Sequence, residues 1–131
     1  MNKTSRNLQT LIETIQTLRG DNGCPWDRKR TNQTMVKYLQ SESAELVEAI
    51  HKNDHANICE EIGDVLYILI MLTEINSTNG YFNLSDVIVD ITEKLIRRHP
   101  HVFAGATYAS EEELAIQWQA IKDEEKKKNT I

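Results

Sequence analysis

The sequence predicts an all-α protein, built as a bundle of four to five helices. Its 131 residues include only two prolines and five glycines, which are the residues that most often interrupt helices. Long stretches instead repeat apolar residues at spacings of three and four, the period of one helix face. The length suits a single domain over residues 1–131 with one hydrophobic core.

The first predicted helix ends near Gly20. Its apolar residues form one stripe, as expected for a helix that packs on a core. Residues 20–33 combine Gly, Pro, Asp and Asn, and the sequence predicts that they form the longest irregular stretch. The stripe consists of Leu8, Leu11, Ile12, Ile15 and Leu18.

Two long helices are predicted next, over residues 34–52 and 55–75, with a short turn between them. Thr31 or Thr34 has the side chain to cap the first helix, and Asp54 to cap the second. The short connection predicts that the two helices fold back on each other as a hairpin.

Two further helices complete the predicted bundle. One starts at Asn83 or Ser85 and stops at Pro100, because proline cannot continue a helix. The last starts at a capping box formed by Ser110 and Glu113. Residues 120–131 are strongly charged, and we expect them to form a frayed tail.

Four carboxylates on the long hairpin are the most informative feature of the chain. Glu42 and Glu45 belong to its first helix, and Glu61 and Asp64 to its second. A spacing of three places both members of each pair on one helix face. If the chain folds back about Asn53, Glu45 lies level with Glu61. The other two acids then lie level with each other, one turn further along.

The energetic cost of these acids limits what they can do. An unpaired carboxylate taken out of water costs roughly several kcal/mol, and a domain is net stable by only about 5–15 kcal/mol. The acids interrupt apolar stripes, and residues 62–72 are apolar nearly all round, which is typical of a helix at the centre of a bundle. The four acids therefore face solvent, pair with Lys and Arg, or bind Mg²⁺ or Mn²⁺. Metal binding is the interpretation that the spacing favours, and Glu60 can join the metal shell.

Basic and aromatic residues recur at helical spacing nearer the end of the chain. Lys94 and Arg98 stand four apart, and so do Trp118 and Lys122. Each pair by itself is typical of a solvated basic face, with Trp118 as a core anchor. Together with an acid cluster they indicate a polyphosphate site, because cations on one side and metal on the other neutralise phosphoryl charge.

The composition narrows the class of partner. A net charge of −5 argues against general nucleic-acid binding, which needs a basic surface. No apolar run reaches the ~18 residues of a membrane span, and no signal peptide is apparent. With only Cys24 and Cys59 as thiols, we expect a cytoplasmic protein with reduced cysteines.

The strings that surround these residues resemble the MazG-type all-α nucleoside triphosphate pyrophosphohydrolases. GCPWD and RRHPHVF are unusual strings, and the acid pattern E-x-x-E followed by E-x-x-D keeps the same order. The matching segments are LRGDNGCPWD at 18–27, SESAELVEAI at 41–50, EEIGDVLY at 60–67, EKLIRRHPHVF at 93–103 and, more weakly, WQAIKDEEK at 118–126.

The resemblance implies Mg²⁺-dependent hydrolysis of an NTP or dNTP to monophosphate and pyrophosphate, with Mn²⁺ as an alternative metal. Water activated by the metal would attack at the α–β phosphate linkage. It also implies a homodimer or homotetramer. Carried over by motif, the acids that would hold the metal and take part in catalysis are Glu42, Glu45, Glu61 and Asp64, with Glu60 as an additional acid. The residues that would bind phosphates are Lys94 and Arg98. The nucleotide pocket would be completed by Trp118 and Lys122, with Trp26 as a further stacking residue.

Other functions stay open, and one departure from the family pattern favours one of them, the regulator without turnover. Members of the family often carry a glutamate where this chain has Ser41, a weaker and neutral ligand. The alternatives are an alarmone (p)ppGpp hydrolase, a metal- or nucleotide-binding regulator without turnover, and an interaction bundle whose acids and bases form salt bridges. Trp26 can equally serve to anchor its own loop.

Overall fold

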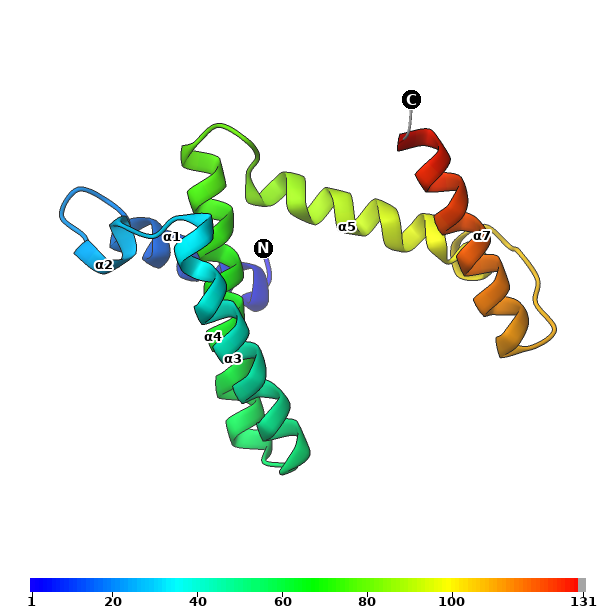
Figure 1. Ribbon diagram of the computed structural model, residues 1–131, viewed down its shortest axis with the longest axis horizontal. Helices are drawn as coiled ribbons and strands as arrows, with labels where there is room; N and C mark the ends of the chain where they lie inside the picture. Colours follow the sequence, from blue (N-terminus) through cyan, green and yellow to red (C-terminus); the bar gives the residue numbers. More distant parts are fainter. Residues whose placement is uncertain (130–131) are drawn as a thin grey trace. The chain divides into compact units, whose positions relative to one another are not determined.

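The structure is a computed structural model that describes residues 1–129. Helices are the only regular secondary structure among these residues (Figure 1). This confirms the predicted all-α class. The chain divides into two compact units, Met1–Leu84 and Ser85–Ile131. The helices are α1 (Lys3–Leu18), α2 (Pro25–Arg28), α3 (Asn32–His51), α4 (His55–Thr78), α5 (Leu84–Arg98), α6 (Pro100–Phe103) and α7 (Glu111–Asn129).

The first helix ends two residues before Gly20, close to its predicted end. Asn2 caps α1, because its side-chain oxygen accepts a hydrogen bond from Ser5 N at 2.8 Å. The stretch 20–33 is not irregular throughout, since α2 forms one helical turn within it. Pro25 occupies the first turn of that helix, where its missing N–H removes no intrahelical hydrogen bond.

Helices α3 and α4 form the predicted hairpin and lie side by side (Figure 1). Thr31 caps α3 in a reciprocal pair with Thr34. Asp54 caps α4 by accepting a hydrogen bond from Asn57 N at 3.2 Å. Between the helices, Asn53 adopts the left-handed conformation with φ 53°, which asparagine tolerates better than most residues.

The end of α4 extends beyond the predicted boundary at residue 75. Residues 76–78 continue the helix, although the sequence predicts a loop there. Asn76 explains the difference, because its amide donates to Asn32 Oδ1 at 2.9 Å and to Leu72 O at 2.8 Å. A buried asparagine is thus satisfied inside the helix, which removes its usual preference for a turn.

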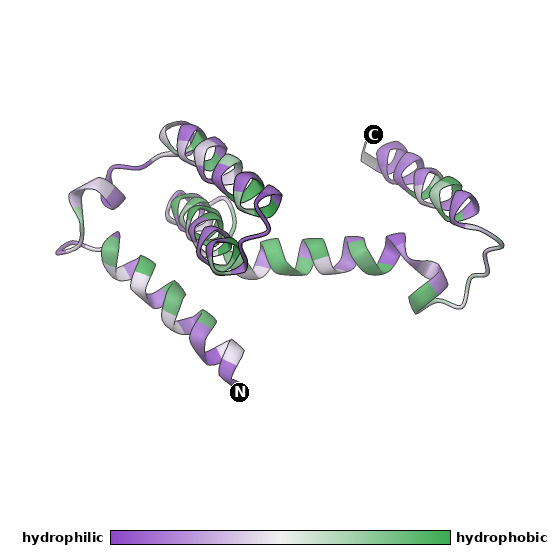
Figure 2. Ribbon diagram, turned by 90° about the horizontal axis from the view of Figure 1, so that it is seen from below, coloured by the Kyte–Doolittle hydropathy of each residue, from purple (hydrophilic) through white to green (hydrophobic). Residues whose placement is uncertain are grey.

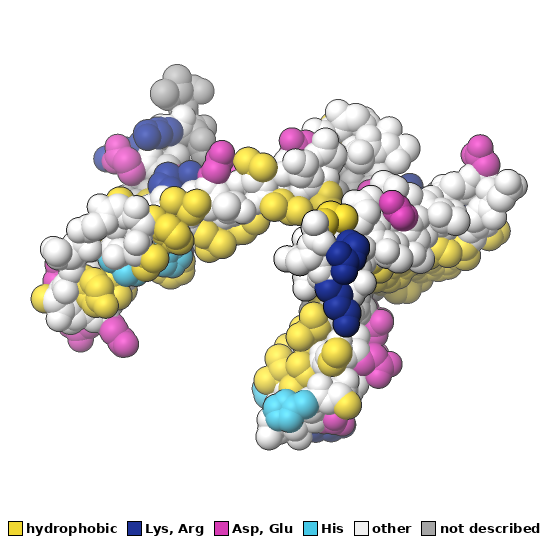
Figure 3. All heavy atoms as spheres, turned by 180° about the vertical axis from the view of Figure 1, so that it is seen from behind, with side chains coloured by type: hydrophobic (Ala, Val, Ile, Leu, Met, Phe, Trp, Pro, Cys, Tyr) yellow, Lys and Arg dark blue, Asp and Glu magenta, His cyan; other side chains and the backbone are white. Residues whose placement is uncertain are grey.

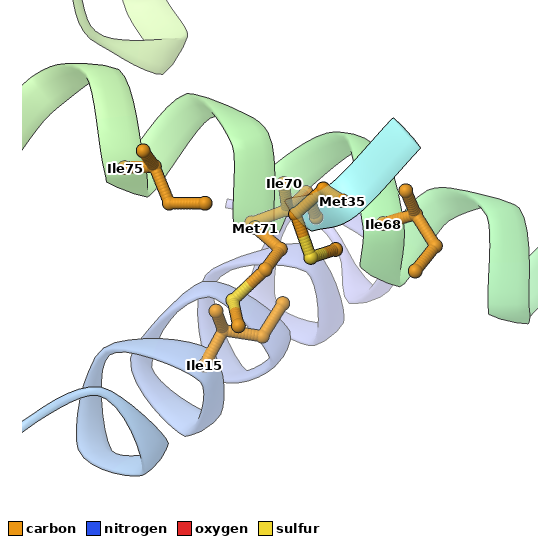
Figure 4. Packing of buried hydrophobic residues seen from close by; sticks show 6 residues of the cluster. All are labelled: Ile15, Met35, Ile68, Ile70, Met71 and Ile75. Carbon is orange, nitrogen blue, oxygen red and sulfur yellow. The ribbon is translucent and has the colours of Figure 1, made fainter. Parts of the chain in front are cut away.

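The core of the first unit lies where α1 and the start of α3 meet α4. Figure 4 shows Ile15 and Met71 directed toward one another, with Met35 beside them. Partly buried aromatic residues such as Trp26 and Tyr67 pack around this cluster. Its buried members are Ile15, Met35, Ile68, Ile70, Met71 and Ile75.

Within the first unit the apolar stretch 62–72 is buried on one side only, so that unit alone does not place α4 at the centre of a bundle. Ile62, Leu66 and Leu69 are 52%, 39% and 47% exposed. The reason is that α4 packs on α3 and α1, which cover only part of its circumference. An apolar surface of α4 therefore remains open to solvent.

The second unit contains α6, α7 and all but the first residue of α5. Apolar and polar residues alternate along α5 in Figure 2, and none of its residues is buried. The space-filling view shows hydrophobic side chains at the surface along this helix (Figure 3); they include Val87, Ile88, Ile91 and Leu95, each at least 40% exposed.

The boundaries of these helices follow the predicted signals. Helix α5 ends two residues before Pro100, which then begins the single turn of α6. Ser110 Oγ accepts from Glu113 N at 3.2 Å, as a capping side chain does, whereas the Glu113 carboxylate accepts from Ala109 N. Within the described residues, no helix combines the length and apolar character that crossing a bilayer requires.

The charged end of the chain is helical farther than predicted. Residues 120–129 belong to α7, where the sequence predicts a frayed tail from residue 120 onwards, and residues 130–131 lie outside the described part. Glu125 supplies a physical reason, because its carboxylate pairs with Arg97 and Arg98 of α5. Such a contact holds the middle of the charged segment in place.

Candidate functional site

The four predicted acids meet between α3 and α4. Glu42 and Glu45 come from α3, and Glu61 and Asp64 come from α4. One carboxylate oxygen from each lies within 4.8 Å of the corresponding oxygens of the others. The spacing of three and the short turn at Asn53 are sufficient to produce this arrangement. We refer to these four residues as the acid cluster.

The acid cluster is not neutralised by the protein. Glu42 Oε2 and Glu61 Oε2 are buried and accept no hydrogen bond from the described residues. The ion pairs of the described chain involve other acids, Glu48, Glu124 and Glu125. Because buried polar atoms in folded proteins are normally satisfied, these two oxygens indicate a missing partner. The salt-bridged interaction bundle predicted as one alternative is therefore disfavoured at this position.

Two carboxyl groups of the acid cluster have raised pKa values. Desolvation, reinforced by Glu45 and the other acids, raises the pKa of Glu42 from 4.5 to about 7. The pKa of Glu61 is raised as well, again chiefly by desolvation and then by the charge of Glu45. Both shifts express the cost of crowding like charges where water is partly excluded. A bound cation would remove that cost.

The donor set suits a hard divalent cation. Four carboxylates offer oxygen alone, which is the ligand type that Mg²⁺, Mn²⁺ and Ca²⁺ prefer. Neither sulfur nor imidazole belongs to the acid cluster. Cys59 lies on α4 but is exposed, and it does not belong to the acid cluster. The residues present therefore fit a magnesium or manganese ion.

Two neighbouring positions from the sequence analysis lie outside the cluster. Glu60 is exposed and is not one of the four converging acids. Ser41, the position at which the sequence analysis finds a departure from the family pattern, is exposed too. The cluster thus forms from four residues without a contribution from either position.

The predicted phosphate and pocket residues Lys94, Arg98, Trp118 and Lys122 belong to the second unit, and Trp26 belongs to the first. Arg98 and Trp118 line one cavity of about 370 Å³, together with His99 and His101. The Lys122 ammonium lies 3.8 Å from the centre of the Trp118 ring, a cation–π distance. Lys94, one turn before Arg98, is half-buried.

Arg98 is held by an acid that the sequence analysis did not single out. Glu125 Oε1 accepts hydrogen bonds from Arg98 Nε at 3.1 Å and Nη2 at 2.8 Å. Arg97 Nε donates to Glu125 Oε2 at 2.6 Å. The spacing carried a signal for this residue, because Trp118, Lys122 and Glu125 follow the i, i+4, i+7 pattern of one helix face.

Trp26 anchors its loop. It is half-buried against the core and makes an edge-to-face contact with Tyr38, with ring centroids 5.0 Å apart. The Arg30 guanidinium lies 4.5 Å from the centre of the indole ring. These contacts support the anchoring alternative over base stacking. Sequence analysis also missed Asp27, which is 5% exposed and accepts a hydrogen bond from Tyr67 of α4.

Comparison with known proteins adds an independent line of evidence. Residues 30–103 match the MazG nucleotide pyrophosphohydrolase domain, a range that contains the whole acid cluster. The chain is 41% identical, over 92% of its length, to a Thermotoga maritima protein named nucleoside triphosphate pyrophosphohydrolase/pyrophosphatase MazG. It is 35% identical, over 91% of its length, to the nucleoside triphosphate pyrophosphohydrolase of Escherichia coli K12.

The relatives differ from this chain in length. The chain spans less than half the length of these curated relatives, 46% of each. A solved structure is closer in size: the crystal structure of a mazG-related protein from Thermotoga maritima superimposes with a TM-score of 0.72 at 33% identity. That match covers 88% of this chain and 98% of the other.

Proposed function

Because this chain belongs to the family of MazG nucleotide pyrophosphohydrolase domains, we propose that it hydrolyses nucleoside triphosphates to a nucleoside monophosphate and pyrophosphate. The observation that carries this proposal is the acid cluster, with two buried carboxylate oxygens that have no hydrogen-bond partner among the described residues. Such an arrangement costs stability without a cation, and metal-bound phosphate is the substrate group that it would serve.

Glu42, Glu45, Glu61 and Asp64 would hold the metal, Mg²⁺ or Mn²⁺. A divalent ion there would supply Lewis-acid chemistry, neutralising phosphate charge and acidifying a water molecule. The protein's own part is to keep four carboxylates convergent on a rigid helical hairpin. One of these acids, or the exposed Glu60, would orient the water that attacks the α–β linkage.

The second unit would supply the groups that recognise the nucleotide. Lys94 and Arg98 would bind phosphate oxygens, for which ammonium and guanidinium groups are suited. Trp118 and Lys122 would complete the nucleotide pocket, since an indole face accepts a base by stacking. This part of the proposal is supported by the cavity that Arg98 shares with Trp118.

We also propose that the working form is a homodimer or homotetramer. The support is the apolar surface that is exposed on α4 and on α5. Ile62, Leu66 and Leu69 of α4 are exposed, and several apolar residues of α5 are as well. Contiguous exposed apolar surface is a common mark of an interface, and the oligomeric mass in solution tests the proposal.

The activity is tested by measuring monophosphate and pyrophosphate released from a panel of NTPs and dNTPs, with (p)ppGpp as a further substrate. Each reaction is run with Mg²⁺ and with EDTA. Release of both products only with Mg²⁺, and its loss in Asp64→Asn, is the expected result. Glu48→Gln is the matched control, because Glu48 lies on α3 outside the cluster and pairs with Lys52.

Two results would contradict the proposal. Undiminished release in EDTA would show that no metal is needed. Absence of release from every nucleoside triphosphate, in folded protein, would overturn triphosphate hydrolysis, and release from (p)ppGpp alone would assign the site to an alarmone instead.

A further inference from the structure

Glu125 joins the two arginines at the end of α5 to the middle of α7. Its Oε1 accepts from Arg98, and its Oε2 accepts from Arg97 at 2.6 Å. The Arg98 side chain is 21% exposed and the Glu125 side chain 17% exposed, whereas Arg97 is 49% exposed. The contact with Arg98 is thus the better shielded of the two, and shielding strengthens an ion pair.

The geometry of this contact leaves Arg98 able to bind something else. A guanidinium has five N–H donors, and Glu125 uses those on Nε and one on Nη2. The donors of Nη1 point away from that shared edge of the planar group. Two guanidinium charges also outweigh one carboxylate, so the three residues retain a net positive charge.

Glu125 does not line the cavity that Arg98 shares with Trp118. It lines a neighbouring cavity of about 540 Å³, together with Arg97 and Ile121, whereas Arg98 lines the one with Trp118 and the two histidines. The Glu125 carboxylate therefore bonds an arginine of the Trp118 cavity without lining that cavity itself. From that position it acts through the arginine and does not touch a ligand held beside the indole.

We propose that Glu125 is a positioning residue, which fixes the Arg98 guanidinium at the cavity lined by Trp118 so that it binds the phosphates of the substrate. The inference rests on the proposed function for the identity of the ligand. Fixing an arginine in advance lowers the entropy lost when phosphate binds. Because Trp118, Lys122 and Glu125 share one face of α7, the same contact sets Arg98 in register with the other two residues.

The test is the variant Glu125→Gln, which keeps the size of the side chain and removes its charge. We expect the KM for the preferred nucleotide to rise about tenfold, the size expected for loss of one charge-assisted contact. The kcat should change less than about twofold, because the acid cluster is untouched. A purely structural role would instead lower the fraction of active protein, and so kcat, at an unchanged KM.

Glu124→Gln is the matched control, since Glu124 is the preceding residue of α7 and forms only a loose pair with Lys127, at 3.8 Å. Its KM should stay near that of the parent. In an Arg98→Lys background, Glu125→Gln should add little to the loss, because the partner through which it acts is already altered. Independent effects of the two substitutions would overturn the proposal.

Calorimetric titration with pyrophosphate and Mg²⁺ separates this inference from the activity. Weaker pyrophosphate binding by Glu125→Gln supports the positioning role even if no nucleotide is hydrolysed. Equal binding by parent and variant overturns it, and so does the absence of any binding by the parent. Tighter binding by the variant also overturns it, because Glu125 would then compete with phosphate for Arg98.

Discussion

Tyr67 of α4 donates a hydrogen bond from its hydroxyl to the carboxylate of Asp27, which lies 40 positions earlier in the chain. Asp27 is buried in the turn of α2, so this bond ties the segment before α3 to the helix that carries Glu61 and Asp64. Burial and then the Asp27 contact raise the pKa of the Tyr67 hydroxyl, which therefore remains a neutral donor.

We expect Tyr67→Phe to destabilise the protein by about 1–3 kcal/mol, because the Asp27 carboxylate would stay buried without this donor. The free energy of unfolding from urea denaturation measures the effect. Tyr81→Phe is the control, because Tyr81 is 75% exposed and its hydroxyl is free to bond water. An equal, small loss in both variants would show that the hydrogen bond contributes nothing.

Conservative changes in the acid cluster should abolish turnover while the fold survives. Glu61→Gln and Asp64→Asn each remove one anionic ligand, and we expect activity to fall by about 100-fold or more. The measurement is pyrophosphate release at saturating Mg²⁺, with helical content checked by circular dichroism. Either variant at full activity would remove that residue from the site.

Substitution of Glu42 should not destabilise the protein when no metal is bound. Its Oε2 is buried without a hydrogen-bond partner in the part of the chain that the structure describes, so Glu42→Gln should leave the metal-free protein as stable as the parent or more stable. Mg²⁺ should stabilise the parent by about 2.7 kcal/mol at one hundred times the dissociation constant, which is seen as a higher melting temperature. The variant should lose most of that gain. A Glu48→Gln control should keep it, and an equal gain in all three proteins would place the ion elsewhere.

The raised pKa of Glu42 also predicts how stability depends on pH. The folded state holds this proton up to about pH 7, whereas the ordinary carboxyl releases it near 4.5. The folded state therefore binds more protons between these values, and the free energy of unfolding contributed by Glu42 falls as pH rises from 4.5 to 7. Denaturation of metal-free protein across this range should show the decline, and Glu42→Gln should flatten it. A decline of the same slope in the variant would assign it to other groups.

The acid cluster was predictable because it depends only on local rules. Spacing of three places Glu42 with Glu45 on one helix face, and a short turn brings that face opposite the second pair. Caps at Thr31 and Asp54 likewise follow from side chains next to the helix they start. None of these features requires knowledge of distant contacts.

The features that sequence reasoning missed depend on distant contacts. Asn76 is helical because Asn32 completes its hydrogen bonds, and periodicity cannot report such a partner. The pairing of Arg98 with Glu125 requires the course of the chain between α6 and α7. Burial of Trp26 against Tyr38 depends on how the turn of α2 packs.

The turn at Asn53 has a consequence for how this protein can vary in length. Helix α3 ends at His51 and α4 begins at His55. The turn between them therefore sets how far α4 is shifted along α3 and how it is rotated about its own axis. Each residue of a helix advances it by about 1.5 Å and turns it by about 100°. One residue added or removed at residues 52–54 would thus separate the four ligands, even though the turn is exposed. Insertions and deletions should be tolerated between α6 and α7, where residues 104–110 carry no ligand, and excluded from this hairpin turn.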